Sequence, residues 1–580
     1  MRTLLDLLSP RNGSDEAGPR LVWRDADLAL PASRAWDAPA PGPDGWSTLG
    51  ADDVRAEVTR LAAGLVALGV EPGERVALMM ANRPEHWLAD LATLHANAVP
   101  TSFYHTLAAA QVADQAEHAG VRTVVIEGAT QLEQWSPALK GGRIERLILL
   151  DESLLDSAVG PATVTSYREV LEQGRALLSG NPHALAERTG QVAGDTPATV
   201  IFTSGTTSAP KAVVLTHDNV ISHAAALVEA AGLAHPYITL CHLPFAHIAD
   251  RAISYYLALF LHGTVYFNPD PSCLPATIRA ARPTVLFGVP RLWEKIAALL
   301  SARAADADAE TVLAQAGLDR VVWAPSAGAP LAAHLAETLR AMGVPLADVW
   351  GMSEVSGLVT AAKFSGSRVG TVGKVLPCMD IRVADDGELL VRGPNVTPGC
   401  LRPDGAIDLV VDAEGFLPTG DIGSIDPDGY VRVVDRKKEL IITSGGKNIS
   451  PVAIESALSS SPLVSQALAY GSNRPYVVAL LTLDPDAAHA LISEKDPSSP
   501  EDSVDVGNHP LVRDAIAAHV AAVNAQLSRP EQVKAWALLG EQWTTESGHL
   551  TPSLKMKRRV VEQAHFGDLD ALYQAPRTGA

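Results

Sequence analysis

Near the start of the chain, apolar residues recur with the spacing of one face of a helix. They are Val54, Val58, Leu61, Leu65 and Leu68. The turn GVEPGE (69–74) then breaks the pattern, and RVALMM (75–80) has the composition of a buried strand. The pattern predicts a helix, a turn and a strand, in this order.

Further apolar runs of strand length alternate with helical patterns such as RLWEKIAALL (291–300). These runs are residues 121–127, 146–151, 199–203, 284–290 and 321–328. Such alternation predicts mostly parallel sheets covered by helices, which bind ligands beyond the carboxyl ends of their strands.

The pattern changes after about residue 380, where short apolar runs are separated by Gly and Asp turns. This texture is typical of a small antiparallel barrel or sheet. From about residue 435 to the end, a helix at 449–461 and a strand at 476–484 predict a small α+β unit. The chain is therefore expected to be a multidomain α/β and α+β protein.

Composition supports packed domains and excludes some partners. The chain has 580 residues, of which 47% are hydrophobic, and its formal net charge of −20 repels nucleic acid and anionic membrane. The run from Ala252 to Phe267 is too short to span a bilayer and contains His262 and Gly263, so a buried helix running into a strand is expected there. We expect no nucleic-acid partner and no integral membrane segment.

The cysteines and the N-terminus indicate the compartment. Four cysteines are scattered without CxxC spacing, which argues against a structural zinc or a disulfide framework. The first ten residues lack a convincing secretory signal. A cytoplasmic location is the expectation.

A polar loop between two apolar runs is the first candidate site. Residues 203–211, TSGTTSAPK, follow a strand-like run, so their backbone N–H groups and hydroxyls could bind an anion. The loop lacks the Walker A pattern. Taken alone, it could equally be an ordinary surface connection.

The loop is one of seven motifs that occur in a fixed order. They are TSGTTSAPKAVVLTH (203–217), LPFAHIADR (243–251), SAGAPL (326–331), WGMSE (350–354), TGDIG (419–423), DRKKELIITSGGKNISP (435–451) and LTPSLKMKRR (550–559). This series resembles the adenylate-forming (ANL) superfamily of acyl-CoA synthetases, adenylation domains and luciferases. Residues 284–296 resemble the long-chain and bubblegum-type acyl-CoA synthetases in particular.

The resemblance implies a two-step reaction. A carboxylate attacks the α-phosphorus of ATP, which gives an acyl-adenylate and pyrophosphate, and the thiol of coenzyme A then displaces AMP. It also implies a division of the chain into a large domain (1–434, with a β-rich, barrel-like subdomain at about 380–434), a hinge (435–439) and a mobile C-terminal domain (440–580).

The resemblance assigns ligands to individual residues. The pyrophosphate would be held by Thr203, Ser204, Gly205, Thr206, Thr207 and Lys211. Glu354 would bind Mg²⁺ through an oxygen, and Thr206 would also act in catalysis. The nucleotide would lie against Ser326, Gly328, Ala329, Pro330, Trp350, Gly351, Met352 and Ser353.

The resemblance also gives Asp421, Arg436, Trp350 and His247 specific positions around the ligands. Asp421 would accept the ribose hydroxyls, although it could also be a simple turn former, and Arg436 would lie beside ribose and phosphate. Trp350 stands where the family usually has Tyr and would stack on the base, whereas for a lone Trp core packing is the alternative. His247 would be a gate beside the thiol tunnel, with an ordinary core histidine as the alternative.

The C-terminal motifs imply domain alternation. Lys555 would bridge carboxylate and α-phosphate oxygens during adenylation, and the lobe would then rotate about Lys438. Gly445 and Gly446, with Lys447 beside them, would line the pantetheine tunnel. The neighbouring cations Lys557, Arg558 and Arg559 are expected to form a solvated basic face.

The phosphate loop departs from the family pattern, because Ser208 and Ala212 each replace a glycine. A non-glycine residue in a left-handed backbone costs about 1–2 kcal/mol, which handicaps ATP binding without forbidding it. One hypothesis is therefore a ligase that adenylates poorly but converts a supplied acyl-adenylate into the thioester.

The favoured interpretation is a complete AMP-forming ligase for a long-chain or bulky hydrophobic carboxylic acid, using ATP, Mg²⁺ and coenzyme A. Transfer of the acyl group to a carrier protein and a non-catalytic nucleotide or coenzyme A sensor are alternatives from other classes. The sequence identifies neither the acid nor the oligomeric state, and a homo-oligomer is compatible with it.

Overall fold

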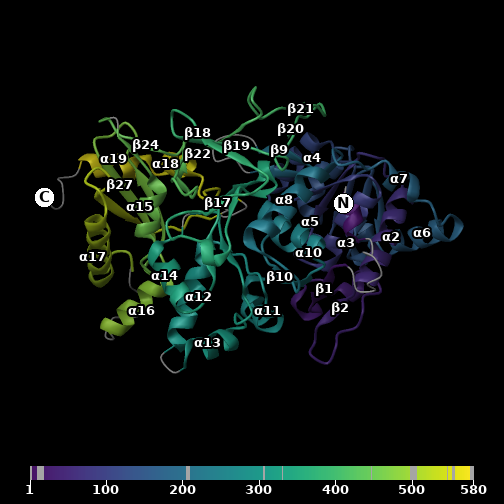
Figure 1. The fold of residues 1–580 in the computed structure, drawn as a ribbon, viewed down its shortest axis with the longest axis horizontal. Coiled ribbons are helices and arrows are strands. Elements are labelled where there is room, and N and C mark those ends of the chain that lie inside the picture. The colour runs from purple at the N-terminus through teal and green to yellow at the C-terminus, as the bar shows by residue number, and fades with distance from the viewer. Residues whose placement is uncertain are drawn as a thin grey trace.

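The computed structural model describes residues 3–8, 18–203, 210–304, 307–329, 331–445, 447–496, 506–544, 547–551 and 555–574. In Figure 1 the N-terminal helices and strands lie on the right and the C-terminal elements on the left. The elements up to β23 are called the large lobe below, and those from β24 onward the C-terminal lobe.

A five-stranded parallel sheet forms the core of the N-terminal part, in the order β4-β3-β5-β6-β7. Its strands are β3 (Arg75–Met79), β4 (Val99–Ser102), β5 (Thr123–Ile126), β6 (Arg146–Leu149) and β7 (Thr163–Ser166). Alternate residues of β3, β5 and β6 enter two different hydrophobic cores, as a sheet covered on both faces requires. The predicted helix and strands in this region are confirmed.

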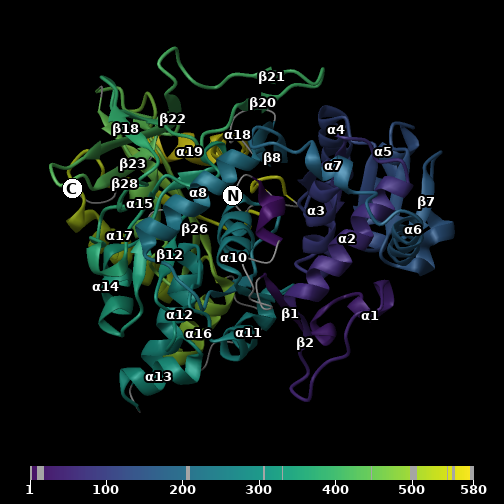
Figure 2. The same cartoon turned by 45° about the vertical axis from the view of Figure 1, so that its right-hand side comes forward.

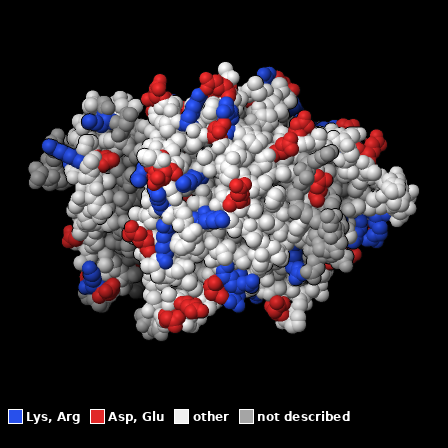
Figure 3. Space-filling model, in the orientation of Figure 1, with Lys and Arg blue, Asp and Glu red and all other residues white. Residues whose placement is uncertain are grey.

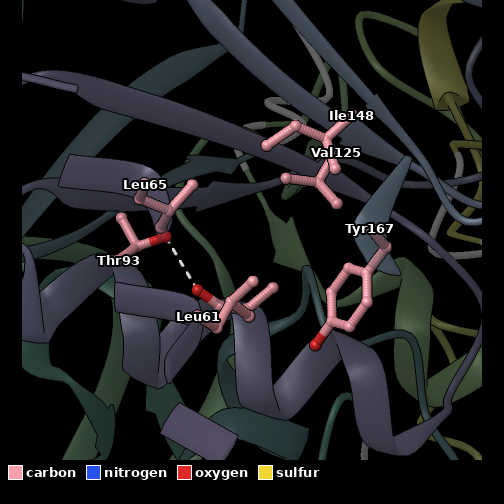
Figure 4. Close-up of a pocket in the computed structure, with 7 residues that line it drawn as sticks. Leu61, Leu65, Thr93, Val125, Ile148 and Tyr167 are labelled. Atoms are coloured by element: carbon pink, nitrogen blue, oxygen red, sulfur yellow. Dashed lines mark hydrogen bonds between the residues drawn. The ribbon is translucent and has the colours of Figure 1, made fainter. Parts of the chain in front are cut away.

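Helices cover both faces of this sheet. They are α2 (Ala51–Ala67), α3 (Pro84–His95) and α6 (Tyr167–Gly180) on one face, and α4 (Ala109–Ala119) and α5 (Ala129–Lys140) on the other. Figure 4 shows a void between the first group and the sheet, lined by Leu61, Val125, Ile148 and Tyr167 among others. It is too small to admit a water molecule, and the Thr93 hydroxyl at its edge already donates to the Ala89 carbonyl at 2.7 Å. The void is a gap in packing.

A second, mixed sheet has the order β10-β11-β1-β2, in which only the β1–β2 pair is antiparallel. Its strands are β1 (Arg20–Trp23), β2 (Ser47–Leu49), β10 (Ile238–Cys241) and β11 (Thr264–Phe267). Before β11 the chain forms one helical run, α9 (Ile248–Asp250), the π-helical η4 (Arg251–Tyr256) and α10 (Leu257–Leu261). The predicted buried helix leading into a strand is confirmed. Among the described residues, no helix is long and apolar enough to cross a membrane.

The strands on either side of the polar loop form an antiparallel hairpin. β8 (Pro197–Thr203) pairs with β9 (Lys211–Thr216), and β20 (Gly399–Leu401) and β21 (Ile407–Asp408) extend the sheet. The short connection between β8 and β9 requires this antiparallel arrangement, whereas a parallel pair needs a long crossover. The helix α8 (His217–Ala231) follows at once.

The predicted strand at 284–290 is reduced to two isolated bridges, Val285 with Trp323 and Gly288 with Ser326. The segment ends at Pro290, which opens α12 (Pro290–Arg303). β12 (Ala324–Ser326) pairs in parallel with β13 (Leu346–Asp348). The helices α11 (Leu274–Ala281), α13 (Ala309–Ala316) and α14 (Ala333–Ala341) pack with α12 around a separate core.

The β-rich region expected after residue 380 is an open four-stranded antiparallel sheet, not a closed barrel, over the described residues. Its order is β18 (Asp380–Val383), β19 (Glu388–Arg392), β22 (Leu417–Ile425), β23 (Val431–Arg436). Figure 2 shows this sheet next to the C-terminal lobe.

The C-terminal lobe has its own three-stranded sheet, β26-β27-β28, with a hydrophobic core on each face. Its elements are β24 (Ile441–Ile442), β25 (Asn448–Ile449), α15 (Pro451–Leu458), β26 (Val464–Tyr470), β27 (Val477–Leu483), α16 (Pro485–Lys495), α17 (Pro510–Gln526), β28 (Val533–Leu539), α18 (Arg558–Ala564) and α19 (Phe566–Gln574). The predicted helix and strand of this unit are confirmed as α15 and β27.

On the face of the molecule seen in Figure 3, Lys and Arg side chains are interspersed with Asp and Glu. The four cysteines are all free. Within the described part of the chain, no cluster of three or more His, Cys, Asp or Glu side chains could hold a metal ion.

Candidate active site between the lobes

Asp421 and Arg436 are cross-strand neighbours in β22 and β23. The Asp421 side chain is only 4% exposed, and its Oδ1 accepts a hydrogen bond from Arg436 Nε at 2.7 Å. Trp350 Nε1 donates to Oδ2 of the same carboxylate at 2.8 Å. Sequence reasoning selected all three residues from separate motifs, and the fold brings them into direct contact.

Lys555 of the C-terminal lobe faces this group. Burial raises the pKa of Asp421, and Arg436, Trp350 and Lys555 oppose that shift. Burial and the nearby Arg436 lower the pKa of Lys555, while Asp421 and Glu439 act in the opposite direction. Protein atoms surround its amine, yet the residue keeps an exposed surface. The two lobes therefore place one lysine against an anchored carboxylate.

His247 lies close to the same lysine. It caps α9, where its Nδ1 accepts the Ala249 N–H at 3.1 Å, so a neutral ring carries its proton on Nε2. Burial, with a smaller effect of Lys555, lowers its pKa to about 4. The imidazole is therefore neutral near pH 7.

The WGMSE segment is shaped by close backbone contacts. β14 (Gly351–Met352) pairs with β15 (Gly357–Leu358), and a Cβ on Gly351 would lie 2.1 Å from the Gly357 carbonyl oxygen, so glycine is required. Ser353 and Glu354 follow in the 3-10 helix η6 (Ser353–Val355), where the Glu354 carbonyl accepts Thr397 N–H at 2.8 Å.

Glu354 and Lys211 both lie close enough to Cys400 to affect the pKa of its thiol. The pKa of the Cys400 thiol is raised by burial and by Glu354, and lowered by Lys211. Cys400 lies on β20, which pairs with β9 directly after the phosphate loop. The predicted metal ligand and the predicted phosphate-binding lysine thus lie on the same side of the large lobe.

The predicted adenine segment follows β12. The Ser326 hydroxyl is buried and has no hydrogen-bond partner among the described residues. Gly328 has φ of +94°, a conformation that favours glycine, and Ala329 is exposed. Pro330 lies outside the described residues. A buried hydroxyl without a partner, beside open backbone, suits a polar ligand edge such as adenine.

The phosphate loop is described only at its ends. Thr203 pairs with Lys211 in the β8–β9 register, and the Thr203 hydroxyl donates to the Lys211 carbonyl at 3.5 Å. The remaining predicted loop residues lie outside the described residues: Ser204, Gly205, Thr206, Thr207 and Ser208.

Ala212, one of the two residues that replace a family glycine, is fully buried. It pairs with Phe202 on one side and Leu401 on the other, inside an apolar core. Its methyl group therefore fills space in that core. Only Ser208 remains as a physical reason for weakened ATP binding.

Lys438 is exposed in the turn that joins β23 to β24. Gly445 and Lys447 are also exposed, and a Cβ on Gly445 would meet nothing closer than 3.9 Å. Lys447 N–H donates to Thr443 Oγ1 at 3.2 Å. Gly446 lies outside the described residues. In this arrangement of the lobes, packing does not demand a glycine at 445.

Sequence reasoning missed Asp435 and misplaced Arg558. The Asp435 carboxylate contacts the Ser450 hydroxyl and accepts Val452 N–H at 3.3 Å. Arg558 was expected on a solvated face, but its side chain is 12% exposed and pairs with Glu455 at 2.7 Å. Ser450 followed by Pro451 was the available signal for a capped helix start, but this pair does not reveal a carboxylate that lies far away in the sequence.

Two family models match the chain. Residues 30–401 match the AMP-binding enzyme family, and residues 438–577 match the AMP-binding enzyme C-terminal domain. Long-chain-fatty-acid–CoA ligase FadD15 of Mycobacterium bovis is 32% identical over 572 residues, covering 91% of this chain and 92% of the relative. Long-chain-fatty-acid–CoA ligase ACSBG2 of Xenopus laevis is 28% identical, covering 89% and 79%.

Solved structures share the fold. The A domain of carboxylic acid reductase from Segniliparus rugosus, in complex with AMP and a carboxylic acid, has a TM-score of 0.75 at 21% identity, covering 99% of this chain and 94% of that one. O-succinylbenzoate CoA synthetase of Bacillus subtilis, in complex with its acyl-adenylate, has a TM-score of 0.66 at 20% identity, covering 91% and 97%.

The chain belongs to the AMP-binding enzyme family. This confirms the resemblance to the adenylate-forming superfamily, and the relationship to long-chain-fatty-acid–CoA ligases confirms the predicted class of enzyme.

Proposed function

We propose that this protein is an AMP-forming acyl-CoA ligase that converts a long-chain or bulky hydrophobic carboxylic acid into its coenzyme A thioester through an acyl-adenylate. The observation that carries the proposal is the meeting of Lys555, from the C-terminal lobe, with the Asp421–Arg436 pair of the large lobe. The relatives named as fatty-acid ligases along nearly the whole chain support the choice of acid.

In the adenylation step, Asp421 accepts the ribose hydroxyls and the Ser326 hydroxyl meets the adenine edge. Thr203 and Lys211 hold the pyrophosphate end, together with the loop hydroxyls between them. The Lys555 ammonium then lies between the attacking carboxylate and the α-phosphate, where negative charge is shared in the transition state. A cation already placed near the reacting groups needs little reorganisation at that moment.

Mg²⁺ fits the residues at the phosphate end. Glu354 offers hard carboxylate oxygen there, which is the donor that Mg²⁺ prefers, with substrate phosphates supplying further oxygens. When bound, the ion neutralises charge on the departing pyrophosphate. Lys211 on the same side of the lobe adds a second positive charge.

The thioester step requires Lys555 to leave. We propose that the C-terminal domain, residues 440–580, rotates about the hinge at 435–439, with Lys438 absorbing the change in backbone angles. Gly445, Gly446 and Lys447 would then face the pantetheine arm, which explains a glycine that packing does not require in the present arrangement. The neutral His247, which lies near Lys555, would act as the gate beside the path of the thiol.

A ligase impaired in adenylation remains a second candidate, and it now rests on Ser208 alone. A reducing cytoplasm is the proposed compartment, since all four cysteines are free. The identity of the acid is the part of the proposal that needs a direct screen.

The proposal is tested by separating the half-reactions. Purified protein is given ATP, Mg²⁺ and a panel of fatty, aromatic and polycyclic acids, and acid-dependent pyrophosphate exchange is measured. Synthetic acyl-adenylates with coenzyme A are then followed for thioester formation. Exchange and thioester formation with the same hydrophobic acid support a complete ligase. Thioester formation without exchange supports the impaired form, and activity in neither assay with any acid contradicts both.

A further inference from the structure

Both oxygens of the Asp421 carboxylate accept hydrogen bonds from other side chains. Arg436 Nε donates to Oδ1 at 2.7 Å and Trp350 Nε1 donates to Oδ2 at 2.8 Å. A carboxylate oxygen has two acceptor positions, so, counting partners among the described residues, each oxygen keeps one position for a ligand. The two hydrogen bonds fix the plane of the Asp421 carboxylate. The two neighbouring hydroxyls of a ribose could each donate to one of its two oxygens.

The two donors differ in how firmly they are placed. The Arg436 side chain is 47% exposed, and an exposed ion pair holds its geometry weakly. Trp350 is 8% exposed, and its backbone is fastened on both sides. Its N–H donates to Thr360 Oγ1 at 3.1 Å, and its carbonyl accepts Val359 N–H at 2.8 Å. The buried indole is therefore the more rigid of the two donors.

The indole N–H also favours the charged form of the carboxylate. Burial raises the pKa of Asp421, and the hydrogen bond from Trp350 opposes this shift. Only the ionised carboxylate keeps both oxygens as acceptors for ribose hydroxyls. Phe at position 350 would retain an aromatic face but could not donate, and one carboxylate oxygen would lose its partner.

We propose that Trp350 is a positioning residue for the ribose: its indole N–H fixes the Asp421 carboxylate so that the free acceptor positions face the 2′- and 3′-hydroxyls of ATP and of the acyl-adenylate. This inference rests on the proposed function and goes beyond the base-stacking role predicted from the sequence. It makes the enzyme's discrimination between ribose and deoxyribose depend on a tryptophan that touches neither hydroxyl.

The test compares ATP with 2′-deoxy-ATP in the intact protein. For Trp350→Phe, we expect the ratio of kcat/KM values for ATP and 2′-deoxy-ATP to fall about tenfold, through the KM for ATP more than through kcat. A loss of folded protein lowers the apparent kcat/KM for both substrates equally and therefore leaves their ratio unchanged. An unchanged ratio in a folded variant would overturn the proposal and leave only stacking or packing.

A matched control uses the carboxylate itself. In the Asp421→Ala background the ribose acceptor is gone, so adding Trp350→Phe should no longer change the ratio. A full additional effect there would show that Trp350 acts independently of Asp421. Equilibrium binding of ATP and 2′-deoxy-ATP gives the same comparison without turnover. If the proposed reaction fails with every acid, a ribose preference lost in Trp350→Phe would still support this inference.

Discussion

The carboxylate of Asp435, the first residue of the proposed hinge at 435–439, accepts a hydrogen bond from the Ser450 hydroxyl at the start of α15, beyond the hinge. The same Oδ2 accepts Val452 N–H at 3.3 Å in the first turn of that helix. A carboxylate is favoured at a helix N-terminus, where unpaired N–H groups carry positive partial charge. The contact spans the hinge, so a rotation of the C-terminal domain must break it.

We therefore expect Asp435 to stabilise the arrangement of lobes that forms the adenylate. Asp435→Asn removes the charge but keeps the size, and the acid-dependent pyrophosphate exchange should fall about tenfold because a charge-assisted hydrogen bond is weakened. Thioester formation from a supplied acyl-adenylate should be unchanged or faster. Ser450→Ala is the matched variant on the other side of the hinge and should act in the same direction. An equal loss in both half-reactions would show that the contact supports folding and not the balance of conformations.

Lys555 should be required for one half-reaction only. Lys555→Ala is expected to lower adenylation by about 10²–10³-fold, the usual effect of removing a preorganised transition-state charge. Thioester formation from the adenylate should remain within a few-fold, since that step follows the rotation. Arg559→Ala removes an exposed cation four residues away and serves as the control. A comparable loss of the second half-reaction in Lys555→Ala would argue against domain alternation.

The pH dependence of adenylation should also report on Lys555. Burial and Arg436 lower the pKa of its amine, so the ammonium loses its charge at a lower pH than an ordinary lysine does. Adenylation should therefore decline on the alkaline side as pH rises through that lowered pKa. The decline should be absent from thioester formation with supplied adenylate. Lys555→Arg, which stays charged, should lose the alkaline decline in whatever activity it retains.

The two residues that replace family glycines should behave differently. Ser208→Gly should lower the KM for ATP, by up to about tenfold if the position is left-handed. Ala212→Gly should leave the KM for ATP unchanged and lower the free energy of unfolding by about 1 kcal/mol, because a buried methyl is lost from a strand. ATP kinetics and thermal unfolding of both variants measure this. A gain in ATP affinity for Ala212→Gly would contradict the core role assigned to its methyl.

Much of the fold followed from the sequence because its elements are strongly patterned. The apolar stripe of α2 and the buried run of β3 obey simple periodicities, and the structure confirms both. The strand predicted at 284–290 is reduced to two isolated bridges, with Trp323 and Ser326, and Pro290 ends the segment by opening α12. The local pattern of apolar residues determines whether a segment forms a helix or a strand. How a strand pairs depends on which other segments of the chain lie beside it.

The candidate site was predictable as a set of residues but not as a set of contacts. Ordered motifs selected Asp421, Arg436 and Trp350, yet nothing in the sequence showed that the Trp350 indole donates to the Asp421 carboxylate. The Asp435–Ser450 contact and the burial of Ala212 were likewise invisible, since each depends on segments that meet only in the folded chain.

The most direct test of the account is one mass-spectrometric experiment in which wild-type protein and Lys555→Ala each receive the cognate acid with ATP, Mg²⁺ and coenzyme A, and separately the synthetic adenylate with coenzyme A. AMP and thioester are measured in each reaction. The account predicts that wild-type protein forms both products from either starting point, and that Lys555→Ala forms them only from the adenylate. Thioester formation by Lys555→Ala from free acid and ATP at the wild-type rate would contradict it.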